Sequence, residues 1–587
     1  MSCQRRTASI SEKTKKRGQE STSSKADRDR RGYWPWRDLL DLVIASGHLD
    51  PIRTTAGFCP RNASRTTVSN LPRHRNFFSS PTRAAEVSMF DDRSSGKDEK
   101  AAADLESSVA VLQLDTQDAS VKLDKHGLPL IPQPSNDPSD PLNWPQFLKI
   151  AILLQVSWLA GLGPLNQAMI NPAFVPLAAH FHVTTVVASY QTTVAIGTVA
   201  LGSFLWNPLA ATYGRRPVLL FSTLVAAASS LGSGMAQTWG QLIVTRVLNG
   251  IGTASFFTLG AAMVSDCFFL HERGRAMGVF TVFLTNSAHI APIPGGFLAQ
   301  YVNYRWCYYV PGILDLTLFV IMFFCLPETL YIRGSKPVKT DRPILRRMGL
   351  WNLRPADKHM KFSDFSNQFV MFAYPTVLIS ALYYAVTFTV SSILPAVTSA
   401  TLFKKLYDFT PSKTGLALGA GTLIGSTLGE LLGGLVVDRS MYLSRKKAQG
   451  GEILPEVRLR GIWLGAILQP IGVLVWGFCI QYKTPYIGPV FGFGIMCFAV
   501  QIISTVLYSY NADCYKPQTA ESAQVMNFFR QAFGMTTGFW AIPLGTKIGF
   551  QFMGVTLALI GLVFFLPVLF LMSHGKTVRS KLGAPKH

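Results

Sequence analysis

Apolar residues gather in twelve runs between residues 148 and 572, and polar stretches separate them. Each run has about 20 residues or more, which lets an α-helix cross the roughly 30 Å hydrocarbon core of a bilayer. The runs centre on 148–169, 186–208, 217–236, 241–264, 276–299 and 306–327, and then on 369–395, 414–437, 460–480, 486–509, 522–545 and 549–572. The pattern predicts an all-α membrane protein with 12 transmembrane helices in two pseudo-symmetric six-helix bundles.

The same runs divide the chain into five parts. Residues 1–145 are polar and have little apolar periodicity, so we expect a disordered cytosolic tail. The other parts are a first six-helix bundle at 146–327, a cytosolic central loop at 328–368, a second bundle at 369–572 and a cytosolic tail at 573–587. At Met89 the tail changes from 17 basic and 8 acidic residues to 5 basic and 11 acidic residues. Residues 1–88 are therefore either an extension with its own role or the product of an overextended gene model.

Charged residues make up only 15% of the chain, whereas soluble proteins carry about a quarter. The net charge of +22 could indicate nucleic-acid binding, but the cations lie mainly between the apolar runs, as the positive-inside rule places them. We therefore expect no nucleic-acid partner and two cytosolic termini. The membrane is expected to be the plasma membrane, with a vacuolar or other internal membrane as the alternative. The eight cysteines form no CxxC pair, which predicts free thiols and neither a disulfide framework nor a metal site.

The turn between the second and third runs carries two adjacent arginines and no acidic residue. Gly214 allows a tight turn, and Arg215 and Arg216 anchor it among lipid headgroups or reach carbonyl groups at helix ends. Alternatively, the two arginines only fix the topology. A related turn stands at the equivalent place in the second half, where the segment Gly-Leu-Val-Val-Asp-Arg ends at Asp438 and Arg439.

One arginine lies inside the fourth run. Arg246, Asn249 and Gly250 are spaced so that they share one helix face. An arginine within a membrane span is costly, so it must face the bundle interior or a polar cavity, and snorkelling to the outer surface is the alternative. Its guanidinium keeps its proton, so Arg246 can pair with a substrate group or an acid but cannot carry a proton itself.

The fifth run contains a row of small residues and prolines. The row consists of Gly278, Ser287, Ala291, Pro292, Gly295 and Gly296. Ser287, Ala291 and Gly295 follow one another at steps of four residues, which lets another helix approach closely. Pro292 removes a backbone donor and bends the helix. Close packing is sufficient to explain such a row.

These motifs resemble those of the major facilitator superfamily. The turn matches four positions of the family pattern G-x-L-x-D-R-x-G-R-R/K, from Leu209 to Arg216. Ala211 stands where the family has Asp, and Asn207 and Thr212 replace its Gly and Arg. In the family this Asp helps to hold the two halves together on the inner side. Because its second-half counterpart, the Asp of the eighth–ninth turn, is kept, we expect an inner gate held mainly by that turn.

Other segments extend the resemblance. The Arg246 segment is similar to the family's L-x-x-x-R-x-x-Q-G-x-G, and the row of small residues is similar to the G-x8-G-x3-G-P-x2-G-G of its antiporter branch. Pro327-Glu328-Thr329 resembles the signature that ends the sixth helix, and residues 137–144 resemble the lead-in to the first helix of fungal multidrug:proton antiporter-like members. The resemblance covers about residues 137–572.

Few titratable side chains lie inside the runs, and they are the candidates for coupling transport to protons. The candidates are Arg246, Asp315, Glu430 and His289. Carboxyl and imidazole groups can exchange a proton, whereas Arg246 would act on a neighbouring acid. Glu430 could instead pair with the arginines of the eighth–ninth turn, and Asp315 could instead bond a neighbouring backbone group.

A substrate pocket between the halves would be lined by polar and aromatic side chains. The candidates are Gln155, Asn166, Gln167, Tyr190, Gln191, Asn249, Asn286, Tyr383, Tyr384, Asn527 and Gln531. Packing without substrate contact is the alternative for each of them.

The resemblance implies a secondary active transporter that works by alternating access. It further implies proton-coupled export of small hydrophobic or amphipathic molecules such as drugs, toxins or secondary metabolites. The alternatives are a proton-coupled importer or facilitator of a small nutrient, and a non-transporting membrane sensor. The sequence contains no G-x-x-x-x-G-K-[ST] loop, so we do not expect ATP to drive it. We expect no enzymatic activity and no cofactor, and a monomer whose partners are its substrate, protons and the lipid bilayer.

Overall fold

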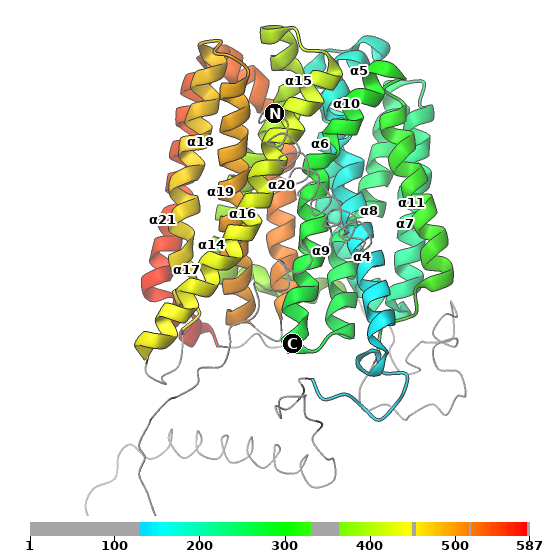
Figure 1. Ribbon diagram of the computed structural model, residues 1–587, viewed down its shortest axis with the longest axis vertical. Coiled ribbons are helices and arrows are strands. Elements are labelled where there is room, and N and C mark those ends of the chain that lie inside the picture. Colours follow the sequence, from blue (N-terminus) through cyan, green and yellow to red (C-terminus); the bar gives the residue numbers. More distant parts are fainter. Residues whose placement is uncertain are drawn as a thin grey trace, which may run out of the picture. The chain divides into compact units, whose positions relative to one another are not determined.

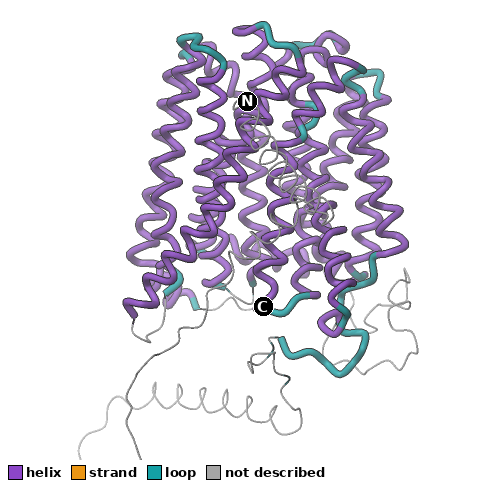
Figure 2. Tube along the Cα trace, viewed as in Figure 1, coloured by secondary structure: helices purple, strands orange, loops and turns teal. Residues whose placement is uncertain are grey.

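The computed structural model describes residues 122, 130, 132–331, 363–448, 454–515 and 518–583. Most of the predicted N-terminal tail, all of residues 1–88 and residues 332–362 of the predicted central loop lie outside the described residues. The described residues are helical, with connecting loops and no strand (Figures 1 and 2).

The first half of the described chain forms the helices that were predicted as six spans. In chain order they are α4 (Gln146–Ala168) followed by α5 (Phe174–Phe181), α6 (Thr185–Tyr213), α7 (Arg215–Met235), α8 (Trp239–Cys267), α9 (Leu270–Ile290) followed by α10 (Pro292–Tyr301), and α11 (Trp306–Cys325). The short 3-10 helices η1 (Pro141–Asn143) and η2 (Asn171–Ala173) precede α4 and α5.

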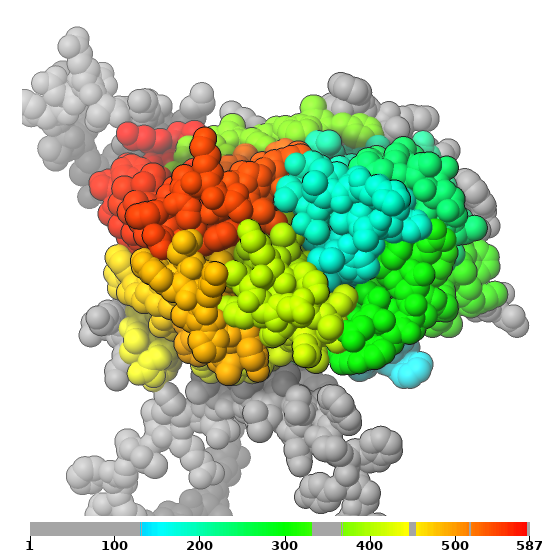
Figure 3. Space-filling view, turned by 90° about the horizontal axis from the view of Figure 1, so that it is seen from above, coloured from blue at the N-terminus to red at the C-terminus, as the bar shows by residue number. Residues whose placement is uncertain are grey.

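The second half repeats this arrangement. Its elements are α13 (Ser363–Ser366), η3 (Asn367–Ala373), α14 (Pro375–Phe388), η4 (Thr389–Ile393), α15 (Leu394–Tyr407), α16 (Pro411–Ala448), α17 (Glu456–Leu459), η5 (Arg460–Ile462), α18 (Trp463–Gln481), α19 (Ile487–Cys514), α20 (Thr519–Ile548) and α21 (Phe550–Leu582). Seen from above, the first half (cyan to green) and the second half (yellow to red) lie side by side (Figure 3).

Eleven of the described helical segments are long and apolar enough to cross a membrane. The predicted eleventh span, 522–545, forms α20, which has 30 residues but is less apolar because it carries Gln524, Arg530 and Gln531. Helix α20 packs against α6 and α14 within the bundle. The predicted fold class, an all-α membrane protein with two six-helix bundles, is confirmed.

Two spans depart from a simple helix. The fifth breaks between Ile290 and Pro292, where α9 passes into α10, because proline cannot donate a backbone hydrogen bond. The seventh begins at Pro375 rather than at residue 369, and its middle is the π-helical turn η4. π-helical turns widen a helix locally and are frequent at functional sites.

The end of the predicted tail packs against the first half. Asp140 is buried and accepts a hydrogen bond from the backbone N–H of Leu142, at the start of η1. Lys149 of α4 donates from Nζ to the Leu142 carbonyl oxygen at 2.9 Å, and Trp144 is buried. The ordered bundle therefore begins before residue 146.

Candidate functional site

A cavity lies between the two halves. It encloses about 890 Å³ of space between atoms, counted with its opening, and α4, α6, α8 and α9 line it from the first half. The second half contributes side chains from α14, η4, α15, α16, α19 and α20. Five residues of the predicted sets reach this cavity, namely Gln167, His289, Pro292, Tyr384 and Gln531. A cavity between repeated halves is where substrate sites of such membrane bundles are found.

Among the described cavity residues that the sequence analysis did not include as pocket candidates, Arg530 is the cation. It lies on α20, is 8% exposed, and its guanidinium stands over the rings of Phe388 at 4.6 Å and of Phe257 at 5.7 Å. Phe257 belongs to the first half, so the cation spans the boundary between the halves. Arg530 lies three residues after Asn527 and directly before Gln531, inside a predicted span. This position was the available signal, because an arginine within a span must face the interior.

A hydrogen-bond chain crosses between the halves at the cavity. Gln501 of α19, which lines the cavity, donates from Nε2 to Ser426 Oγ at 2.9 Å. Ser426 in turn donates to Asn286 Oδ1 at 3.2 Å, and Thr427 donates to the same oxygen at 3.3 Å. The predicted pocket residue Asn286 therefore joins α9 to α16 rather than facing the cavity.

Arg246 and Asp315 are brought together inside the first half, next to the cavity. Arg246 is 0% exposed, donates to the Asn166 carbonyl oxygen at 3.0 Å and to Asn249 Oδ1 at 3.2 Å, and lies over the Tyr308 ring at 5.5 Å. Asn166 Nδ2 donates to Asp315 Oδ2 at 2.9 Å. Complete burial excludes the snorkelling alternative for Arg246. The guanidinium of Arg246 and the carboxylate of Asp315 are thus hydrogen-bonded to the same asparagine.

The other two coupling candidates lie apart from this network. His289 lines the cavity from α9. Glu430 is partly buried on α16, does not line the cavity and interacts electrostatically with Tyr384.

The remaining predicted pocket residues do not line the cavity. Gln155 donates to the Ala151 carbonyl oxygen at 3.1 Å, and Gln191 donates to Oγ1 of Thr192, which does line the cavity. The Tyr190 ring lies 4.9 Å from that of Phe539, and the Tyr383 ring lies 5.4 Å from that of Phe565. Asn527 accepts from the Tyr508 hydroxyl at 3.2 Å.

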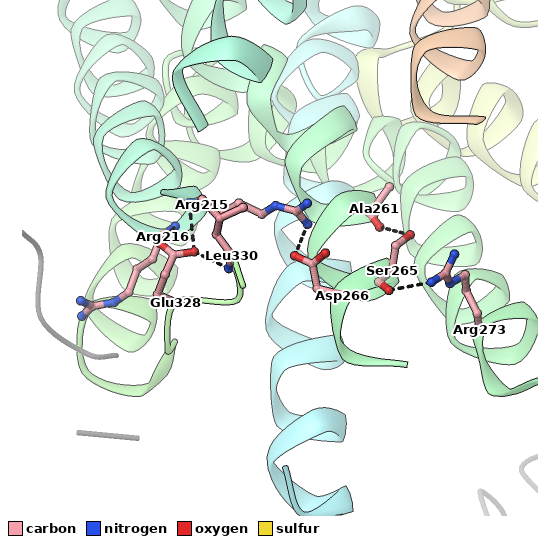
Figure 4. A network of polar contacts seen from close by, with 8 residues as sticks. All are labelled: Arg215, Arg216, Ala261, Ser265, Asp266, Arg273, Glu328 and Leu330. Atoms are coloured by element: carbon pink, nitrogen blue, oxygen red, sulfur yellow. Dashed lines mark hydrogen bonds and ion pairs between the residues drawn. The ribbon is translucent and has the colours of Figure 1, made fainter. Parts of the chain in front are cut away.

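The two arginines of the α6–α7 turn do meet acids, one at the end of α8 and one in the segment after α11 (Figure 4). We name the end of the bundle that carries this turn the motif end. Arg215 forms an ion pair with Asp266, which lies in the last turn of α8. The Glu328 carboxylate accepts from the backbone N–H groups of Arg215 at 3.1 Å and of Arg216 at 2.9 Å. Gly214 has a φ of 102°, which favours glycine, and starts α7 where a carboxylate is favourable.

The second half carries a related set of charges. Arg458 of α17 donates to Asp513, in the last turn of α19, just as Arg215 meets Asp266 at the end of α8. Arg579 of α21 donates to Glu456 at 2.7 Å. The structural counterpart of Arg215 is therefore Arg458.

Asp438 and Arg439, expected to hold the inner gate, are both exposed on α16. Neither has an ion-pair partner among the described side chains. The halves instead meet at the motif end through α6, where Asn207 donates to Gln524 Oε1 at 3.0 Å. Gln368 donates to the Phe204 carbonyl oxygen at 3.0 Å in the same region. Sequence matching with the motif did not identify this contact, because Asn207 stands where the family has glycine.

Small residues of the fifth span let neighbouring segments of both halves approach it closely. A Cβ atom on Gly296 would lie 2.4 Å from the Pro411 carbonyl oxygen of α16, and one on Gly295 would lie 1.9 Å from that of Met169. Ser287 Cβ lies near Gly161 of α4, and Ala291 is fully buried. Gly278, in contrast, has no atom within 4 Å of such a Cβ position.

The model of the Major Facilitator Superfamily matches residues 156–539. The chain is 29% identical over 440 residues to the efflux pump vrtL of Penicillium aethiopicum, covering 73% of this chain and 85% of that protein. It is 27% identical over 404 residues to an uncharacterized transporter of Schizosaccharomyces pombe, covering 67% of this chain and 81% of that protein. A solved structure of a bacterial homologue of the human lysosomal transporter Spinster is similar in fold, with a TM-score of 0.54 at 14% identity, covering 76% of this chain and 100% of that chain. Because the family model covers more than half of the chain, the protein belongs to the major facilitator superfamily of membrane transporters.

Proposed function

We propose that the protein is a proton-coupled exporter of small hydrophobic or amphipathic molecules. The cavity between the halves carries this proposal, because aromatic rings and amide groups from both halves line it. Similarity to the efflux pump vrtL supports export as the direction.

Alternating access requires that contacts on either side of the cavity open in turn. At the motif end, Asn207 of α6 bonds Gln524 of α20, one and a half turns before Arg530 in the cavity. At the opposite end, Gln300 of α10 accepts hydrogen bonds from the backbone N–H and the hydroxyl of Ser412. Both contacts are single polar pairs between the halves, and we propose them as the contacts that break when one end opens.

Asp315 is our first candidate for the proton-coupling group. Its carboxylate is bound by Asn166, and the next residue on α4, Gln167, lines the cavity. A change in the proton occupancy of Asp315 would alter its hydrogen bond to Asn166 and shift the cavity wall by way of α4. Arg246 holds the same asparagine from its carbonyl side and positions it.

Everted membrane vesicles test this function directly. Acidifying the vesicle lumen should drive accumulation of the neutral hydrophobic dye N-phenyl-1-naphthylamine, and a protonophore should abolish it. Arg246→Ala should lose the accumulation while the amount of protein in the membrane stays unchanged. Lys547→Gln, which removes an exposed cation on α20, is the matched control and should transport normally. Flux in the opposite direction, or no proton-dependent flux of any hydrophobic probe, would contradict the proposal.

A further inference from the structure

Arg530 is a buried cation without a carboxylate partner. No ion pair joins it to an acid among the described side chains, and Asp and Glu are absent from the described residues that line the cavity. Its Nε has no hydrogen-bond partner, although it is buried. A buried charge needs a partner of opposite sign to offset its lost hydration. The rings of Phe257 and Phe388 offset part of this cost, and the Tyr384 hydroxyl is hydrogen-bonded to the guanidinium, but none of the three carries the opposite charge.

A second buried donor faces the same cavity. Gln167 Nε2 of α4 is buried and has no hydrogen-bond partner among the described residues. Asn171 adds an unpartnered Oδ1 on the cavity wall, which can accept from a hydroxyl group of a bound molecule. The unused polar atoms therefore comprise a cationic donor, a neutral donor and one acceptor, surrounded mainly by apolar and aromatic side chains.

We propose that the cavity binds amphipathic organic anions, that is, aromatic molecules with one carboxylate or phenolate group. The anionic oxygen bonds the guanidinium of Arg530, and Gln167 is the second donor available to it. The aromatic body of the ligand packs between Phe257 and Phe388, which already flank the cation. This proposal rests on the proposed transport function and names its substrate class.

The charge preference follows from what surrounds the guanidinium. A cationic ligand would meet Arg530 as a like charge without an acidic residue on the cavity wall to offset the repulsion. A neutral aromatic ligand would keep the packing but leave the buried cation without its partner. Charge-assisted hydrogen bonds contribute more than neutral ones, by an amount that corresponds to roughly ten- to hundred-fold in affinity.

Equilibrium binding to the purified full chain, without a proton gradient, tests the site. The probes are 1-naphthoate, the neutral 1-naphthamide and the cation 1-naphthylmethylammonium, which share one aromatic body. Unsubstituted protein should bind naphthoate at least tenfold more tightly than naphthamide, and the ammonium should not compete. Arg530→Gln should remove the preference with naphthamide binding changed less than twofold, and Arg530→Lys should keep part of it. Lys547→Gln on the same helix should retain the full preference.

The outcomes separate this site from the proposed transport. Equal binding of naphthoate and naphthamide to the unsubstituted protein would overturn the anion site even if N-phenyl-1-naphthylamine is exported, and this result does not depend on any variant. An unchanged preference in Arg530→Gln would also overturn it. An Arg530-dependent preference for naphthoate without any proton-driven flux would support the site and contradict the exporter. If Arg530→Gln does not fold, Gln167→Leu provides the second variant and should lower naphthoate affinity more than naphthamide affinity.

Discussion

Glu328 holds the start of α7 in place and lends itself to a quantitative test. It is 2% exposed, accepts from two backbone N–H groups of α7 and interacts electrostatically with the guanidinium of Arg216, which is itself 2% exposed. Glu328→Ala leaves that buried cation and the helix N-terminus without their carboxylate. Breaking a buried ion pair in this way costs about 3–5 kcal/mol. Glu328→Gln keeps an acceptor oxygen and should cost less, about 1–2 kcal/mol.

Denaturant unfolding of the purified protein in detergent, followed by circular dichroism, measures the loss. The control is Asp408→Asn, because Asp408 pairs with Lys404 on the surface, its side chain is 86% exposed, and surface pairs contribute little. The double variant Glu328→Ala with Arg216→Met should regain stability, since it no longer buries an unpaired cation. If Glu328→Ala is no more destabilising than Asp408→Asn, the carboxylate does not hold this turn and the reasoning fails.

Three further predictions concern coupling, packing and gating. Asp315→Asn should leave flux without its dependence on external pH, measured in everted vesicles, and an unchanged pH profile would move the coupling role to another group. Gly296→Ala should lower the free energy of unfolding, by about 1–3 kcal/mol if the helices cannot shift, whereas Gly278→Ala should not lower it, because nothing surrounds that position and alanine is favoured over glycine within a helix. Asn207→Ala should favour opening of the motif end, which would appear as faster labelling of cysteines introduced there. Asp438→Ala should not have this effect. The reverse result would restore the predicted eighth–ninth turn as the gate.

The order and length of the helices could be predicted from the sequence because each helix needs about 20 mainly apolar residues to cross the bilayer. The partners of the charged side chains could not. Arg215 and Glu328 are separated by 113 residues, so a local motif that contains the arginine carries no information about the acid. The absence of an acid at Ala211 was real, yet Asp266 at the end of α8 and Glu328 after α11 bind the arginine residues of this turn within the same half.

Residues that match the motif in sequence also do not always occupy the equivalent positions in the fold. The Asp438 turn resembles the first motif in sequence, but the residue equivalent to Arg215 in three dimensions is Arg458 at the start of the next helix. Arg530 was missed for a related reason. Asn527 and Gln531 of the same run were named as pocket candidates without it, although Arg530 and Gln531 line the cavity and Asn527 bonds Tyr508 within the second half.

The charge pairs at the motif end have a consequence for how the protein is made. Every ion pair between described side chains joins residues of the same half, including Arg215 with Asp266 and Glu456 with Arg579. The first six helices therefore neutralise their own charges while the ribosome is still synthesising the rest. What remains to be formed afterwards is a seam that holds no ion pair between described side chains, with contacts such as Asn207 with Gln524 and Gln300 with Ser412. Two chains divided in the central loop should for this reason still be able to find each other in the membrane.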